Sequence, residues 1–258
     1  MGVDRWFLII STVLAAIAGV RGLLVLSHGR KSPWTVYWMI GVLLCQIGYL
    51  MVRGEMRGAC PLRSIAEISA FLAWSLTVFY LLVGPVYQIS LLGVFTAPVV
   101  VIFQGFALLP GKMDSTPERV LNTTIWGETH AAVSVLAYGA LALAAVAGVM
   151  FLVLDRQLKE HHLKGGLFRF LPPVRELLVS LERLLWLGMF LLTIGLVAGI
   201  LMPHESEGAW KHVLIATGVW ISYILLMVVK RVRGITGRRF ALGAVALFVL
   251  SLGVFAFV

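Results

Sequence analysis

Three polar residues at four-residue steps, His130, Ser134 and Tyr138, have the types and spacing that could do chemistry. Residues four apart lie on one face of a helix, so the three form a polar stripe. The stripe enters a run of 24 uncharged residues, 131–154. At ~1.5 Å per residue this run spans roughly 36 Å, enough to cross a ~30 Å hydrocarbon core. A polar stripe at membrane depth usually faces protein or a cavity, so His130 could bind a ligand at the mouth of a membrane helix.

Two further histidines, His204 and His212, lie in or beside the next connection on the same side of the predicted membrane, with Trp210 between them. A heme needs a flat apolar slot and one or two imidazoles on its iron. The residues therefore suggest a heme site with His130 as one ligand, His204 or His212 as the other, and Trp210 as a wall. Each residue also has an ordinary structural interpretation, because histidine forms hydrogen bonds at membrane interfaces and tryptophan is enriched there.

The composition is that of a polytopic membrane protein, since 60% of the 258 residues are hydrophobic and only 13% are charged. We predict an all-α, integral membrane helical bundle that forms a single transmembrane domain over residues 1–258. Eight apolar runs predict about eight membrane-spanning helices. Their approximate ranges are Trp6–Ser27, Trp34–Val52, Ile65–Val83, Gln88–Leu109, Ala131–Leu154, Leu184–Met202, Trp210–Val229 and Phe240–Val258.

The charged residues predict the orientation of these helices. The ends and connections on one side of the predicted membrane carry 14 basic and four acidic residues, and those on the other side carry seven basic and eight acidic residues. Basic segments remain in the cytoplasm, so we predict that both termini lie outside and that His130, His204 and His212 lie at the outer surface. The predicted outer connection Arg53–Ser64, which contains Arg53, Arg57 and Arg63, argues for the opposite orientation.

Several function classes lack support in the sequence. It contains no H-E-x-x-H motif, no glycine-rich phosphate loop and no G-x-S-x-G motif, so no catalytic constellation identifies an enzyme. The predicted spans hold no paired carboxylates that would mark an ion path, and the net charge of +9 reflects the loops rather than nucleic-acid binding. Gly195 and Gly199 form a G-x-x-x-G and, with Gly188, indicate close helix packing.

Several short motifs resemble the CcsA/CcmC-type family of cytochrome c assembly proteins, over residues from about 65 to 229. They are, in order, Phe71-Leu72-Ala73-Trp74-Ser75-Leu76-Thr77, Thr96-Ala97-Pro98, Phe103-Gln104-Gly105-Phe106-Ala107, the His130 stripe, and Leu192-Thr193-Ile194-Gly195 followed by Gly199. The resemblance implies that the protein handles heme at the outer membrane face for attachment to apocytochrome c. His130 matches the family's first outer heme-ligating histidine, and Trp74, Ser134 and Tyr138 join the expected heme-binding residues.

The sequence also departs from the family pattern. The tryptophan-rich outer motif expected after Gly199 is reduced to Trp210, and Tyr80 replaces a histidine expected after Thr77. The chain length, the Pro172-Pro173 pair and Gly237-Arg238-Arg239 look more like the shorter HemX/YpjD branch, which lacks the tryptophan motif and implies a second hypothesis. In it the protein binds no heme and acts as a regulator or scaffold of heme biosynthesis through its cytoplasmic connection 156–183. The expected partners are membrane lipid and either other cytochrome c assembly proteins or a tetrapyrrole-pathway enzyme, at a bacterial inner (plasma) membrane.

Overall fold

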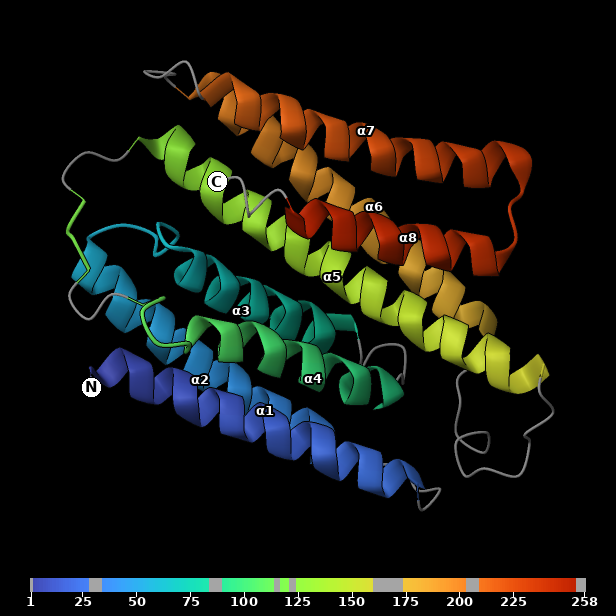
Figure 1. The fold of residues 1–258 in the computed structure, drawn as a ribbon, viewed down its shortest axis with the longest axis horizontal. Coiled ribbons are helices and arrows are strands. Elements are labelled where there is room, and N and C mark those ends of the chain that lie inside the picture. The colour runs from blue at the N-terminus through green and yellow to red at the C-terminus, as the bar shows by residue number, and fades with distance from the viewer. Residues whose placement is uncertain are drawn as a thin grey trace. The chain divides into compact units, whose positions relative to one another are not determined.

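The computed structural model is helical in all the long segments that it describes, which are residues 2–27, 34–83, 90–113, 117–120, 124–159, 174–202 and 209–253 (Figure 1). Within these residues there are eight helices, and each predicted apolar run falls on one of them. They are α1 (Val3–Ser27), α2 (Trp34–Arg57), α3 (Ile65–Val83), α4 (Ser90–Ala107), α5 (Ile125–Lys159), α6 (Val174–Leu201), α7 (Ala209–Arg233) and α8 (Gly237–Leu252). The predicted all-α class is confirmed.

Six of the eight helices, α1, α2, α3, α5, α6 and α7, are long and apolar enough to cross a membrane. The other two are shorter, because the apolar part of α4 is Leu92–Ala107 and α8 has 16 residues. A chain with six such helices is an integral membrane protein. Within the described residues six helices qualify as candidate spans, and the predicted count of about eight spans stays a prediction.

Two helices extend beyond the apolar runs that predicted them. The run for α2 ends at Val52, but the helix continues to Arg57 and ends at Gly58, whose φ of +68° is the left-handed conformation common after a helix. Arg53 and Arg57 are therefore helical and buried, which corrects the prediction that they lie in a surface connection. Helix α5 begins at Ile125, so His130 lies in its second turn rather than at its mouth.

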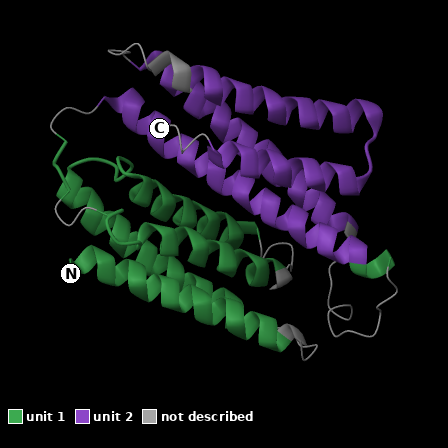
Figure 2. Cartoon of the chain, in the orientation of Figure 1, with its two compact units in different colours: residues 1–122, 157–173 green, residues 123–156, 174–258 purple. Residues whose placement is uncertain are grey.

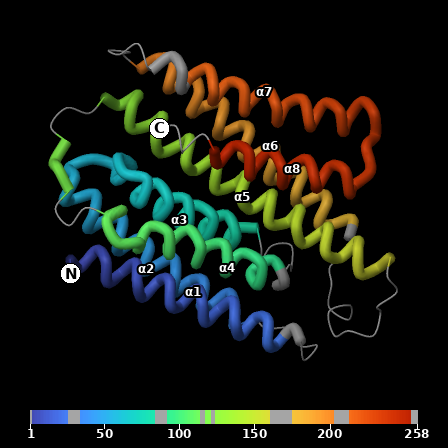
Figure 3. The backbone as a smooth tube through the Cα atoms, viewed as in Figure 1, coloured from blue at the N-terminus to red at the C-terminus, as the bar shows by residue number. Residues whose placement is uncertain are grey.

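The helices form two compact units (Figure 2), residues 1–122 with 157–173 and residues 123–156 with 174–258. Unit 1 contains α1 to α4, and α1 packs against both α2 and α4 while α3 packs against α4 and α2. A hydrogen bond of 2.8 Å from Gln104 Nε2 to Ser11 Oγ joins the interiors of α4 and α1. Successive helices run in opposite directions along the chain (Figure 3), so the start of α1, the end of α2 and the start of α3 meet at one end of unit 1.

Unit 2 contains α5 to α8. Helix α5 packs on α6 through glycines of α6, and its Gly148 lies against Ala241 and Val245 of α8. Helix α7 contacts α6 and α8, and Trp220 Nε1 donates a 2.8 Å hydrogen bond to Thr193 Oγ1 on α6. Gly199, near the end of α6, faces His130, so the start of α5 lies beside the end of α6.

Candidate functional site

His130 is held by a hydrogen bond to the backbone of the neighbouring helix. Its Nδ1 lies 2.7 Å from the carbonyl oxygen of Gly195 on α6, and the side chain is half-buried. A carbonyl oxygen can only accept, so Nδ1 must carry the proton in this bond. In the neutral imidazole the lone pair then lies on Nε2. The hydrogen bond thus fixes both the ring orientation and the nitrogen that can bind a metal.

Small residues on α6 make room for the polar stripe of α5. A Cβ atom at Gly199 would lie 2.6 Å from His130 Nδ1, and one at Gly195 would lie 2.5 Å from Ser134 Oγ. The same holds deeper in the unit, where a Cβ atom at Gly188 would lie 2.7 Å from a methyl carbon of Leu141. Real Cβ atoms almost never make contacts below 3.0 Å, so a larger residue at any of these positions would force the facing side chain or the helix to shift. The close helix packing predicted from these glycines is confirmed.

The other predicted heme-site residues fall into three groups. Tyr138 lies on α5 in unit 2, is buried, and its hydroxyl interacts with Ser251 of α8. Trp74 lies on α3 in unit 1, where its ring packs against Phe71 with centroids 4.9 Å apart. The side chains of His204, Trp210 and His212 lie outside the described residues. Unit 2 therefore brings together His130, Ser134 and the glycines of α6, and the predicted second ligand stays a prediction.

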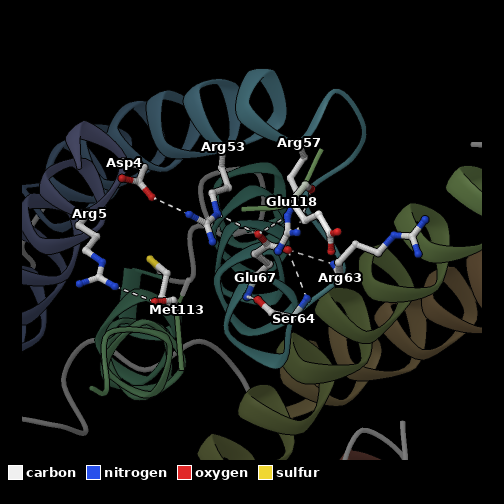
Figure 4. Close-up of polar contacts among 9 residues, drawn as sticks. All are labelled: Asp4, Arg5, Arg53, Arg57, Arg63, Ser64, Glu67, Met113 and Glu118. Atoms are coloured by element: carbon white, nitrogen blue, oxygen red, sulfur yellow. Dashed lines mark hydrogen bonds and ion pairs between the residues drawn. The ribbon is translucent and has the colours of Figure 1, made fainter. Parts of the chain in front are cut away.

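A second polar site, which the sequence analysis missed, lies at one end of unit 1. We call it the Glu67 cluster, and it consists of Asp4, Arg53, Arg57 and Glu67 (Figure 4). Arg53 bonds Glu67 Oε1 through Nε at 2.8 Å and Asp4 through Nη1 at 3.1 Å. Arg57 Nε donates to the same Glu67 oxygen at 3.0 Å. Two guanidinium groups and two carboxylates make the cluster electrically balanced, which burial of these charges requires.

The second oxygen of Glu67 caps the start of its own helix. Glu67 Oε2 accepts hydrogen bonds from the backbone N–H groups of Arg63 at 3.0 Å and Ser64 at 3.2 Å, and Ser64 Oγ accepts one from the Glu67 N–H. This reciprocal pattern is a capping box, and the spacing S-x-x-E ahead of an apolar run is its sequence signature. Among the described residues Glu67 accepts these four hydrogen bonds, two on each oxygen, so its carboxylate joins the end of α2 to the start of α3.

The cluster also fixes part of the connection between α4 and α5. Arg57 Nη1 donates to the carbonyl oxygen of Glu118 at 3.2 Å, and the N–H of Val120 donates to the carbonyl oxygen of Arg57 at 2.9 Å. On the other side, Arg5 Nη2 donates to the carbonyl oxygen of Met113 at 2.6 Å. The end of unit 1 that contains Glu67 is therefore closed by charge-assisted bonds from three arginines.

In the folded protein the cluster pairs two of the arginines that argue against the predicted orientation. Arg53 and Arg57 appeared to place excess positive charge on the predicted outer side. Both pair with buried carboxylates in the folded protein and are not exposed loop charges there.

Comparison with known proteins gives the family. The profile of the cytochrome c assembly protein family matches residues 62–257. Proteins named cytochrome c biogenesis protein CcsA are similar over most of the chain. The one from Chlamydomonas reinhardtii is 28% identical over 200 residues, which cover 75% of this chain and 55% of that protein. The one from Prochlorococcus marinus strain MIT 9301 is 26% identical over 234 residues, which cover 80% and 76%.

A third relative of the same name, from Synechococcus sp. strain WH7803, is 26% identical over 269 residues, which cover 88% of this chain and 84% of that protein. The chain thus spans only a little over half the length of the algal relative but most of the cyanobacterial ones. The residues matched by the family profile include every helix from α3 to α8. This helical membrane protein therefore belongs to the cytochrome c assembly protein family.

Proposed function

We propose that this protein binds heme beside the start of α5, at the outer face of a bacterial plasma membrane, in service of c-type cytochrome biogenesis. The observation that carries the proposal is the hydrogen bond from His130 Nδ1 to the carbonyl oxygen of Gly195. A metal-ligating histidine almost always donates its other ring N–H to a carboxylate, a carbonyl or water, which fixes the tautomer and makes the ligand more basic. His130 has this arrangement, with Nε2 left to bind iron.

The surroundings of His130 suit a flat apolar group. A single imidazole suffices as a protein ligand because the porphyrin itself supplies four nitrogens to the iron. Trp126 and Ile125 are exposed in the first turn of α5, and a Cβ atom at Gly127 would lie 3.3 Å from Met202 at the end of α6. The heme would be the iron porphyrin that c-type cytochromes carry, and the protein would hold it in a defined orientation.

The residues that complete the proposed site come from the sequence pattern. His204 or His212 would be the second ligand and Trp210 a wall, in the connection that follows the end of α6 and in the start of α7. Ser134 and Tyr138 continue the stripe of α5 below His130, where they would supply hydrogen bonds. Trp74, which lies in unit 1, stays a prediction that rests on the family motif around it.

The proposed orientation places both termini outside, with eight helices crossing or entering the membrane. Three features support it. The helices of each unit run in alternating directions, most basic residues then lie on the cytoplasmic side, and Arg53 and Arg57 are neutralised within the Glu67 cluster. In this orientation the start of α5, which carries His130, lies at the outer face.

Absorption spectroscopy tests the heme proposal. We expect protein purified from heme-replete cells to show a Soret band that His130→Ala abolishes and that added imidazole partly restores. His161→Ala, which removes a histidine beyond the far end of α5, should leave the band unchanged. A monodisperse, helical wild-type protein without a Soret band would overturn the proposal.

The sequence also favours a second candidate function. The reduced tryptophan motif supports placement in the shorter HemX/YpjD-like branch, in which the basic connection between α5 and α6 would regulate a tetrapyrrole-pathway enzyme. Deletion of residues 160–173 separates the two functions. If the protein is a regulator, the deletion should abolish its effect on heme synthesis in cells. If it handles heme, the Soret band and cytochrome c maturation should follow His130 instead.

A further inference from the structure

An apolar groove runs along unit 2 between α6 and α7. It has a volume of about 460 Å³ and is lined by nine residues, among them Trp186, Met189, Thr193, Trp220, Met227 and Arg231. Met189 and Met227 are buried and form its floor, whereas Trp186 is 57% exposed at its edge. The hydrogen bond between Trp220 and Thr193 satisfies the polar atoms of both side chains inside the groove. The groove therefore offers an apolar surface that suits a hydrocarbon chain.

The length of the groove matches one leaflet of a bilayer. Arg231 lies in the last turn of α7, and Trp220 lies 11 residues before it. At ~1.5 Å per residue the distance along the helix is about 16 Å, and half of a ~30 Å hydrocarbon core is about 15 Å. A groove that begins at Arg231 near the lipid headgroups thus reaches the middle of the membrane at Trp220, which is the path of one acyl chain.

The positive charge of Arg231 at one end of the groove favours an anionic lipid headgroup. The neighbouring Lys230 is engaged by Glu182 at 2.6 Å and lies 3.9 Å from the centroid of the Phe240 ring. Arg231 instead is exposed and lines the groove. A guanidinium group binds phosphate oxygens in a bidentate manner, and basic pockets between membrane helices bind anionic lipid headgroups.

We infer that the groove binds one anionic phospholipid, with an acyl chain between α6 and α7 and the phosphate on Arg231. The lipid belongs to the leaflet at the basic end of α7, where Lys230, Arg231 and Arg233 gather. The inference does not rest on heme binding, because none of the groove residues belongs to the proposed heme site. The bound lipid would hold α6, which carries Gly195 and Gly199, against α7.

Native mass spectrometry of the full chain tests this inference. The protein would be reconstituted in nanodiscs with equal amounts of phosphatidylglycerol and phosphatidylcholine, and the lipids that stay bound after release would be counted. We expect wild-type protein to retain phosphatidylglycerol about fivefold over phosphatidylcholine. Arg231→Gln should abolish the preference, whereas Arg233→Gln, which removes an exposed charge outside the groove, should preserve it.

A second variant tests the acyl-chain half of the site. Ile224 lines the groove, so Ile224→Trp should fill it and reduce retention of both lipids while leaving the charge unchanged. Unchanged elution and helical circular dichroism would show that each variant folds. Equal losses in Arg231→Gln and Arg233→Gln would reduce the effect to general surface charge and overturn the inference. So would full retention of both lipids in Ile224→Trp, or an oligomeric state of Arg231→Gln that differs from that of the wild-type protein, which would make the groove an interface between copies.

Discussion

Replacing Glu67 by glutamine is expected to lower the free energy of unfolding by about 3–5 kcal/mol. The side chains of Arg53 and Arg57 are 0% and 7% exposed, and both bond the same oxygen of Glu67. Removal of that negative charge leaves two positive charges in a buried site with Asp4 as the remaining carboxylate of the cluster. Thermal unfolding in detergent, followed by size-exclusion chromatography or circular dichroism, should show a large fall in the midpoint.

Glu55→Gln is the matched control for this prediction. Glu55 lies on α2 between Arg53 and Arg57 in sequence but is exposed, so its substitution should change the midpoint little. Simultaneous replacement of the four cluster residues by leucine and methionine should recover most of the loss, because no charge is then left buried without a partner. Equal midpoints for Glu67→Gln and Glu55→Gln would mean that the cluster contributes no stability.

Replacing Gly199 by alanine should remove the proposed heme ligand from its position without touching the histidine. The new Cβ atom would lie 2.6 Å from His130 Nδ1 and 2.9 Å from Cε1, so the ring or the helix must move. Overpacking of this kind costs about 1–3 kcal/mol, and the bond to Gly195 is lost with it. We expect a lower unfolding midpoint and a strongly reduced Soret band.

Gly218→Ala provides the comparison for Gly199→Ala. A Cβ atom at Gly218 of α7 would meet nothing within 4 Å, so alanine there should be neutral or slightly stabilising because it favours the helix. The two readouts can also be separated. A lower midpoint with an unchanged Soret band would confirm the helix contact but exclude the hydrogen-bonded imidazole as the iron ligand.

The helices could be predicted from the sequence because each contains a long apolar run. The ends of the helices could not be predicted in this way, since the apolar runs stop at charged residues. The prediction for α2 ended before Arg53, although Tyr49, Arg53 and Arg57 follow at four-residue steps and all three are buried on one face. The start of α5 was set too late for the same reason, because Glu128 interrupts the apolar pattern.

The candidate sites were predictable to different degrees. The sequence predicts that the stripe beginning at His130 faces protein or a cavity, and His130 and Ser134 do lie against the glycines of α6, because spacing within one helix is a local property. The Glu67 cluster could not be assembled in this way. Its members come from the starts of α1 and α3 and the end of α2, so only the capping pattern of Ser64 and Glu67 was visible locally.

The origin of the Glu67 cluster in three successive helices has a consequence for biosynthesis. Asp4 and the two arginines are translated before Glu67, whose carboxylate both arginines share. The first two helices therefore leave the ribosome with a polar end that is incomplete until the third follows. Until then, these arginines are more stable in water or at the lipid headgroups than in hydrocarbon. We therefore expect α1 and α2 to reach their final positions in the membrane only after α3 has been synthesised.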